Sequence, residues 1–356
     1  MDNFGSYGTN SAYMLNGLYA AIGEFGSNAA LVADPDPSGT GQIVLRASLS
    51  PSGTAQSTRK VLDTPRATVG VALRLWMASL PSNSSQSAVP ITLCDGSNNV
   101  LCSLWITTTG AIDILRNGTT TGAAIIASST GPVLIANAWQ HIEMKATIST
   151  TVGQVEVRVD GVVVIATAAN VNTGGDVNCA QVRQTSDRDG SSGGITWYIK
   201  DYVIWDTTGS HNTDFLGSVS VYRLVPNSDV SLGGWTTSSG STGYNLIDES
   251  PPVDTGYVQA DDSPPAECEF GLTNLPVDVT SVRGLMTLVR AQKTDGGDAQ
   301  LQAKIHSGAS YANGADRPIT TAFTYWYDVQ EEDPDTTAPW LPSAVDAATL
   351  VLDRTV

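Results

Sequence analysis

Carboxylate pairs are the first feature of this sequence that could do chemistry. Two carboxylates that flank a glycosidic bond can supply the acid and the nucleophile, or the base, that cleave it. The candidates are Glu143, the pair Glu156 and Asp160, and the run 331–333. Glu143 is alone on its expected strand. Arg158 lies between Glu156 and Asp160 and favours their ionised form. Adjacent residues of the run 331–333 point to opposite faces of a strand. We therefore expect solvated structural carboxylates, no catalytic residues and no enzyme.

Motifs for a nucleophile or a calcium ion are incomplete. Residues 190–194 match G-x-S-x-G, but a nucleophile elbow needs a strand before the serine and a helix after it. This stretch is rich in glycine and serine and leads into a strand. The loop Asp34–Gly39 copies the first half of a calcium-binding loop, yet its twelfth position is Leu45 instead of a bidentate glutamate. We expect no cofactor and no metal site.

The cysteines and histidines give no metal-ligand pattern either. Cys94, Cys102, Cys179 and Cys268 form no C-x-x-C pair, and His141, His211 and His306 are far apart in the sequence. Cys94 and Cys102 flank a turn, so we expect them near each other on adjacent strands. We interpret the cysteines as buried free thiols of a protein made in a reducing cytoplasm. We expect His141 to face outward on its strand.

The charge balance limits the partners. The formal net charge is −17 and the sequence pI is about 4.3. Such a chain is repelled by phosphate backbones and by anionic membrane surfaces, so we expect neither nucleic acid nor membrane as a partner. The first residues lack the basic and apolar regions of a signal peptide, and no apolar run approaches the ~20 residues of a membrane span. The sequence predicts a soluble protein that is not exported by the ordinary route.

Alternation of apolar and polar residues predicts that the candidates lie on β-strands. Apolar residues recur at every second position in Val69–Met77, in Ile142–Ile148 and in Val155–Val159. The last of these runs reaches Asp160-Gly161, a two-residue hairpin signal, and returns as Val162–Ile165. Many short strands with almost no helix indicate an all-β fold of sandwiches or jelly rolls.

The composition changes near residue 226. Residues 226–265 hold many prolines and glycines, and a strand, Val219–Val225, is expected just before them. We therefore predict two domains, 1–225 and a smaller β-sandwich, 226–356. In the second domain Pro342–Ala348 is expected to form one or two helical turns, and Thr349–Val356 a final strand.

An aromatic cluster in the second domain is the candidate interface. On a strand Tyr325 and Tyr327 face one way and Trp326 the other, so one core cannot bury all three rings. An exposed aromatic side chain is the usual anchor of an interface, and we expect Trp326, Tyr325, Tyr327 and Trp340 to contact a partner. The alternative is that Trp326 lies under the turn at Pro342–Ala348.

One stretch resembles a known family. Residues 139–145 (WQHIEMK) and 153–161 (GQVEVRVDG) look like the concanavalin-A-like, laminin-G-like jelly roll, in which a strand led by tryptophan precedes one ending in V-x-V-x-V-D-G. The resemblance implies that residues 1–225 form one jelly-roll domain.

A second resemblance covers more of the chain. Residues 2–7 (DNFGSY), 198–209 (YIKDYVIWDTTG), 212–217 (NTDFLG) and 333–340 (DPDTTAPW) are similar to segments of virion structural proteins of tailed bacteriophages. The match departs at Lys200, where those proteins often have an acidic residue, and over 27–60. The resemblance implies a non-enzymatic virion protein that is assembled in the host cytoplasm. The role it implies is that of a tail or tail-fibre adaptor or fibre component that binds other virion proteins. The alternatives are a capsid decoration protein and a lectin-like module that binds a host surface glycan. Because fibre and decoration proteins usually meet three-fold sites, we expect a homo-oligomer, a trimer.

Overall fold

The computed structural model describes residues 20–22, 29–36, 43–48, 56–84, 86–120, 122–175, 177–188, 195–249, 252–260 and 266–356. The chain divides into two compact units, the first ending at Val221 and the second running from Tyr222 to Val356. The change of unit falls a few residues before position 226, where the composition changes.

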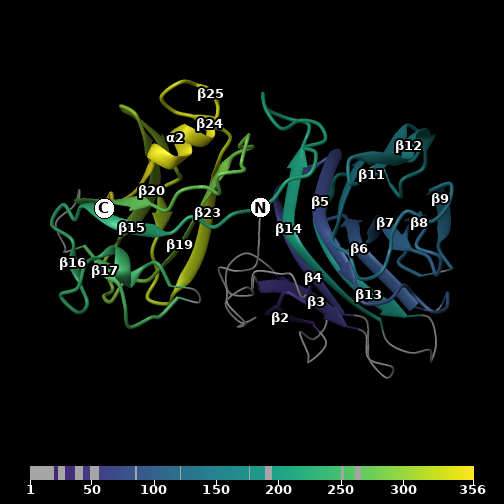
Figure 1. Ribbon diagram of the computed structural model, residues 1–356, viewed down its shortest axis with the longest axis horizontal. Coiled ribbons are helices and arrows are strands. Elements are labelled where there is room, and N and C mark those ends of the chain that lie inside the picture. Colours follow the sequence, from purple (N-terminus) through teal and green to yellow (C-terminus); the bar gives the residue numbers. More distant parts are fainter. Residues whose placement is uncertain are drawn as a thin grey trace. The chain divides into compact units, whose positions relative to one another are not determined.

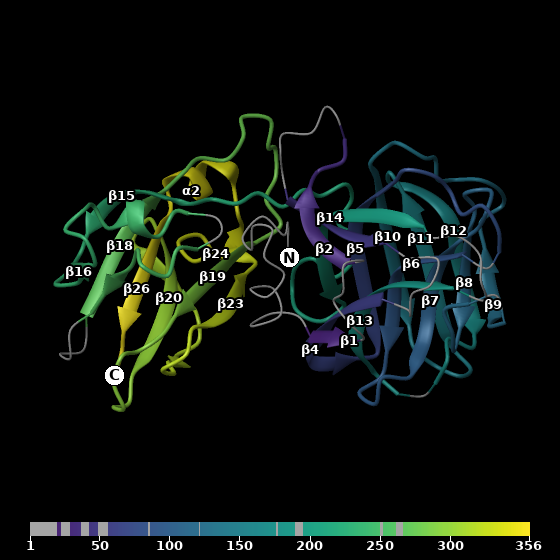
Figure 2. The ribbon, with the colours of Figure 1, turned by 90° about the horizontal axis from the view of Figure 1, so that it is seen from below.

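Alternating apolar residues build unit 1 as two antiparallel sheets, which appear as two layers in Figures 1 and 2. The first sheet has the order β1 (Ala20–Ile22), β4 (Gln56–Arg66), β13 (Cys179–Arg188), β6 (Gln86–Cys94), β7 (Val100–Ile106), β8 (Ile112–Arg116) and β9 (Ala124–Ser128). The second has the order β12 (Val162–Val171), β11 (Gly153–Val159), β10 (Gln140–Thr147), β5 (Thr68–Met77), β14 (Thr196–Asp206), β3 (Ile43–Ser48) and β2 (Ala29–Ala33). The all-β class with a sandwich of jelly-roll type is confirmed.

The expected periodicity sets which side chains fill the space between the layers. On β5 the odd positions Val69, Val71, Leu73, Leu75 and Met77 are at most 3% exposed. Ile142, Met144 and Ala146 of β10 face the same core and are equally buried. The predicted hairpin joins β11 to β12, with φ of +48° at Asp160 and +80° at Gly161, as a two-residue type I′ turn requires.

Unit 2 is built on a six-stranded antiparallel sheet. Its order is β15 (Pro226–Ser231), β18 (Ala266–Leu272), β26 (Thr349–Arg354), β20 (Gln300–Ser307) and β21 (Ser310–Asn313), with β22 (Arg317–Pro318) also paired to β20. Three two-stranded pairs accompany it: β16 (Thr236–Thr237) with β17 (Val258–Gln259), β19 (Leu285–Ala291) with β23 (Thr324–Gln330), and β24 (Glu332–Asp333) with β25 (Ala338–Pro339). Trp326 and Val289 of the β19–β23 pair pack with Phe270 and Leu301 of the large sheet to form the core.

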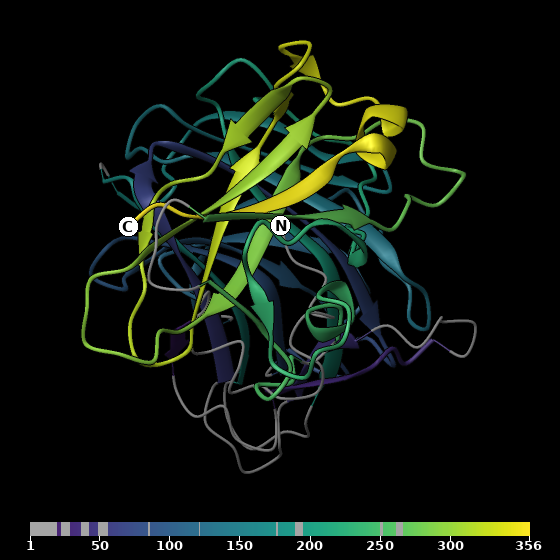
Figure 3. The same cartoon turned by 90° about the vertical axis from the view of Figure 1, so that its left-hand side faces the viewer.

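Among the described residues, helical structure is limited to short turns in unit 2. The 3-10 turn Tyr244–Leu246 precedes β17, and helix α2 (Pro342–Ala347) begins at the proline that predicted it. Strand β26 follows at once (Figure 3, where both are yellow). Both predictions are confirmed. The predicted strand Val219–Val225 is wrong, because this stretch has no strand pairing and the backbone N–H of Val221 instead donates to the side chain of Asp201.

Candidate functional site

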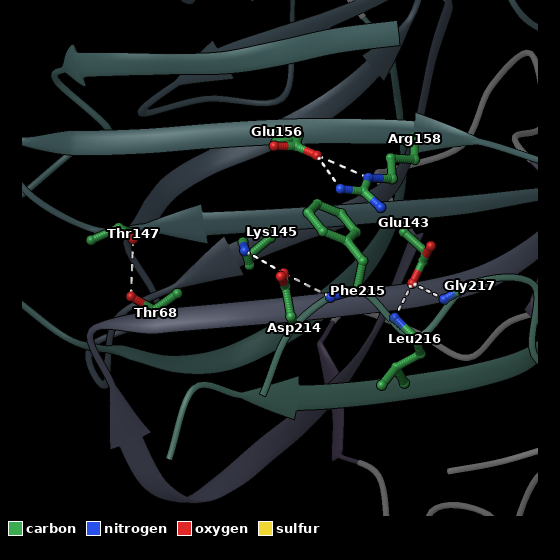
Figure 4. Close-up of polar contacts among 10 residues, drawn as sticks. All are labelled: Thr68, Glu143, Lys145, Thr147, Glu156, Arg158, Asp214, Phe215, Leu216 and Gly217. Carbon is green, nitrogen blue, oxygen red and sulfur yellow. Dashed lines mark hydrogen bonds and ion pairs between the residues drawn. The ribbon is translucent and has the colours of Figure 1, made fainter. Parts of the chain in front are cut away.

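Charged side chains gather on the side of the second sheet that faces away from the sandwich core. Glu143 and Lys145 of β10 stand beside Arg158 and Glu156 of β11 in the antiparallel register. Arg74 of β5 and Lys200 of β14 continue the set on the neighbouring strands. We call this side, defined by Arg74, Glu143, Lys145, Arg158 and Lys200, the polar face. At one end of it the hydroxyls of Thr68 and Thr147 join β5 to β10 at 2.9 Å (Figure 4).

A segment after β14 binds to the polar face. We call residues 207–221 the strap; it has no helix or strand of its own. The backbone N–H groups of Leu216 and Gly217 donate to Oε1 of Glu143 at 2.8 and 3.2 Å (Figure 4). The Glu143 side chain is fully buried. A buried carboxylate needs such donors, since an ion out of water is costly unless it is hydrogen-bonded.

The two strap residues just before Leu216 make a second, more exposed contact. Nζ of Lys145 pairs with Oδ1 of Asp214 at 2.5 Å, and the Asp214 side chain is 70% exposed. The ring of Phe215 lies between two cations, 3.8 Å from the Arg158 guanidinium and 4.9 Å from Nζ of Lys145. The Lys145 ammonium lowers the pKa of Asp214 through its hydrogen bond. Glu156 in turn binds Arg158 at 2.8 Å.

The last part of the strap is held by Asp201 and Arg74. Oδ1 of Asp201 accepts the Val221 N–H at 2.9 Å, and its Oδ2 lies 3.2 Å from Nε of Arg74. Arg74 also donates to Oγ of Ser218 at 2.9 Å. Burial raises the pKa of Asp201, while the Val221 amide and Arg74 oppose that shift. The strap is therefore held by Glu143 at residues 216 and 217 and by Asp201 at its last residue.

Apolar side chains also pack between the strap and the sheet. Leu216 packs with Ala72, Val203 and Trp205 in one buried cluster. The Trp205 indole lies directly on Gly70, where an added Cβ would come within 2.0 Å of it. Any larger residue at position 70 would therefore displace the indole that supports the strap.

The rest of the polar face holds a second group of residues. The rings of Trp76 and Tyr198 form a T-shaped pair with centroids 5.4 Å apart. Nζ of Lys200 lies 4.3 Å from the Trp139 ring centroid. His141 lies beside Arg74 on this face, pointing away from the sandwich core as predicted, but it is fully buried instead of solvated.

His141 has an unusual environment. Neither ring nitrogen has a hydrogen-bond partner among the described residues. Burial, and secondarily the positive charge of Arg74, lowers the pKa of His141 to about 4. The imidazole is therefore neutral at pH 7.

The first carboxylate of the calcium-like loop, Asp34, is hydrogen-bonded and ion-paired to other residues of the chain. Asp34 accepts hydrogen bonds from Trp139 Nε1 at 3.1 Å and from the Asp36 N–H at 2.9 Å, and pairs with Lys200 at 2.8 Å. Its side chain is 1% exposed. Residues 37–42 of this loop and the motif at 190–194 lie outside the described residues. Within the described ranges no group of three potential ligands could hold a metal ion.

The carboxylates do not all have the solvated environment that we expected. That expectation is wrong for Glu143, because the strap covers it, and for Asp333, which is 3% exposed and accepts the Asp335 N–H at 3.1 Å. Glu156 pairs with Arg158, as the sequence indicated. Asp160 accepts the His141 N–H at 2.8 Å beside the hairpin. Each of these carboxylates thus has a structural hydrogen bond.

Three of the four candidate interface residues are buried. Trp326 is 8% exposed, Tyr325 7% and Trp340 2%, while Tyr327 is half-buried. Both sides of β23 are covered: Trp326 packs into the unit 2 core, and the Arg290 guanidinium lies 5.2 Å from the Tyr325 ring.

The alternative for Trp326, a place under the turn at Pro342–Ala348, is wrong. The tryptophan that packs against helix α2 is Trp340, together with Val345 and Ala348. Its indole N–H donates to the Gln330 carbonyl at 3.2 Å.

The buried thiols agree with the sequence prediction. All four cysteines are free and buried, and Cys94 and Cys102 lie on the paired strands β6 and β7. Burial raises the pKa of Cys94 and of Cys268 to about 12 and that of Cys179 to about 11.

The described part of the chain contains no helix long and apolar enough to cross a membrane.

The strap itself was not predicted from the sequence. In the sequence, residues 212–217 differ from their surroundings only in their similarity to segments of virion proteins. The available signal was an acidic residue followed by Phe-Leu-Gly, in a stretch without strand periodicity, after the last strand of the first domain. That pattern does not identify Glu143 as its acceptor.

Comparison with known proteins gives a distant structural likeness. No family model and no curated protein matches the sequence. An endo-β-1,4-glucuronan lyase from the fungus Trichoderma reesei is 15% identical over 53% of this chain and 91% of its own, with a TM-score of 0.41. The cellulose-induced protein Cip1 is 12% identical over 50% of this chain and 84% of its own, at 0.39. An alginate lyase, vAL-1, from a Chlorella virus is 11% identical over 49% and 88%, at 0.36. Because all three TM-scores are low, these likenesses support no conclusion about the activity of this chain.

Proposed function

We propose that this chain is a non-enzymatic structural protein of a bacteriophage virion, a tail or tail-fibre adaptor or fibre component. The non-enzymatic part of this proposal rests on the structural role of Glu143. This buried carboxylate accepts two backbone N–H groups of the strap, so it stabilises the fold instead of facing a substrate. The virion part rests on the sequence resemblance over residues 198–209, 212–217 and 333–340.

Labelling of particles tests this proposal. Antibodies against the purified chain, visualised by immunogold on virions of the phage that encodes it, are expected to mark the tail or its fibres. Label on the head would favour the alternative, a capsid decoration protein. Unlabelled virions, in a preparation where the antibody recognises the free chain, would refute a virion role.

A lectin-like module is the second candidate, because aromatic and cationic side chains adjoin on the polar face. Tyr198 and Trp139 are half-buried, and Lys200 lies over the Trp139 ring. Aromatic faces beside polar groups are suited to stacking on sugar rings. Binding on a glycan array that is lost in Tyr198→Ala, with Tyr222→Ala as the control at an exposed tyrosine, would support this function. The absence of binding to host surface glycans would refute it.

A further inference from the structure

Two arginines lie next to each other on the first sheet of unit 1. Arg59 of β4 is directly opposite Arg183 of β13 in the antiparallel register. Val182, the neighbour of Arg183, is 0% exposed and points into the sandwich core. Because successive residues of a strand point to opposite faces, both arginines lie on the outer side of the sheet. Arg183 is nevertheless 9% exposed, and Arg59 is half-buried.

Both guanidinium groups converge on one side chain, that of Asn98 in the turn between β6 and β7. Nη1 of Arg59 and Nη2 of Arg183 donate to Oδ1 of Asn98 at 2.7 and 2.8 Å. Arg183 also donates to the Asn98 backbone carbonyl at 3.1 Å. Oε1 of Gln181 accepts longer bonds from the same two nitrogens, at 3.4 and 3.5 Å. All of these acceptors are neutral amide oxygens.

No carboxylate pairs with these two positive charges. Among the described residues neither Arg59 nor Arg183 forms an ion pair. Asp95 begins the same turn, but its Oδ1 accepts the N–H groups of Ser97 and Asn99 and its Oδ2 accepts the Asn99 side-chain amide. Two cations held side by side repel each other, and an anion between them would be attracted to both.

Hydrogen-bond donors also exceed acceptors around the two arginines. Nε of Arg59 and Nε of Arg183 are buried and have no partner among the described residues. The hydroxyl of Thr92, opposite Arg183 on β6, is buried without a partner as well. A guanidinium only donates and stays charged in proteins. The cluster therefore lacks both acceptor oxygens and negative charge, and an oxyanion supplies both.

We propose that Arg59, Arg183 and Asn98 form a binding site for a tetrahedral oxyanion of charge −2: sulfate, phosphate or a phosphate monoester. Two guanidinium groups match the charge of a dianion, and their paired N–H groups suit phosphate-like oxygens. The contact between Arg59 and Asn98 is exposed, so a ligand can reach it from solvent. On a chain of net charge −17 the site is a local exception to a surface that repels anions.

The oxyanion site goes beyond the proposed virion role and is tested separately from it. Amide chemical shifts of the purified full chain are titrated with sodium sulfate, inorganic phosphate or glucose 6-phosphate at constant ionic strength. We expect saturable shifts at residues 59, 98 and 183. Arg59→Gln should weaken the affinity about tenfold or more, because it removes one of the two charged donors.

Arg116→Gln is the matched control, because Arg116 is a half-buried arginine on β8 of the same sheet. It should bind these anions as the wild type does. A wild type without saturable shifts, or an Arg59→Gln variant that binds as tightly as the wild type, overturns the proposal. Tighter binding of glucose 6-phosphate than of phosphate would support an oxyanion carried on a sugar, and equal binding would support the free ion.

A second variant supplies the missing charge from the chain itself. Asn98→Asp places a carboxylate between the two guanidinium groups with almost no change of shape, and aspartate tolerates the φ of +72° at this position. We expect this variant to melt at a higher temperature than the wild type and to lose oxyanion binding. An unchanged or lower melting temperature, or binding as tight as that of the wild type, would show that the two arginines do not lack a counter-charge and would overturn the proposal.

Discussion

Replacing Glu143 with alanine should release the strap at a large cost in stability. The change leaves the N–H groups of Leu216 and Gly217 without their carboxylate acceptor. A buried donor left unsatisfied costs about 1–3 kcal/mol. The Leu216 contact is buried and that of Gly217 partly so, and the freed strap can partly regain water. We therefore expect a loss of about 3 kcal/mol in the free energy of unfolding of unit 1.

Two variants control for this change. Lys145→Ala removes the other bond to the strap from the same face of β10, but Asp214 is 70% exposed, so the expected loss is only about 0–1 kcal/mol. Glu143→Gln keeps an acceptor oxygen while removing the charge, and a charge-assisted hydrogen bond is about twice as strong as a neutral one. Its stability should lie between those of the other two variants.

Urea unfolding, followed by circular dichroism, and native-state hydrogen exchange together measure the effect. The amides of Leu216 and Gly217 should lose protection in Glu143→Ala and keep most of it in Lys145→Ala. Equal small losses in the two alanine variants, or unchanged protection of these amides, would refute the reasoning that Glu143 holds the strap.

Three further predictions follow from buried groups. Because the folded pKa of His141 is about 4, below its ordinary value of 6.5, the unfolded chain binds more protons between these values. Stability should therefore fall as pH drops from 6.5 toward 4, by up to ~3 kcal/mol, and His141→Gln should remove that part of the pH dependence in urea titrations at several pH values. The four buried cysteines should react with a thiol reagent at pH 8 only after unfolding, and fast labelling of the native chain would contradict their burial. Trp326→Ala should destabilise unit 2 by about 3–5 kcal/mol without changing the mass in solution, whereas dissociation at unchanged melting temperature would restore an interface role.

The sequence by itself determined the local structure of this protein. Period-two alternation identified the core side of β5 and β10, because successive residues of a strand point to opposite faces. Asp160-Gly161 fixed the hairpin between β11 and β12, since a type I′ turn needs residues that tolerate positive φ. Pro342 marked the start of α2, because its φ suits the first helical turn. These are properties of neighbouring residues.

Only the tertiary structure decided what covers the outward side of each strand. Alternation predicted that Glu143 and His141 point away from the core, but a segment 73 residues later in the chain supplies the donor that buries Glu143. The same limit applies to Trp326, which alternation placed opposite its tyrosine neighbours without showing that the large sheet of unit 2 lies over it. Burial of an outward-facing side chain depends on contacts between distant segments, and residue spacing does not encode which segment arrives there.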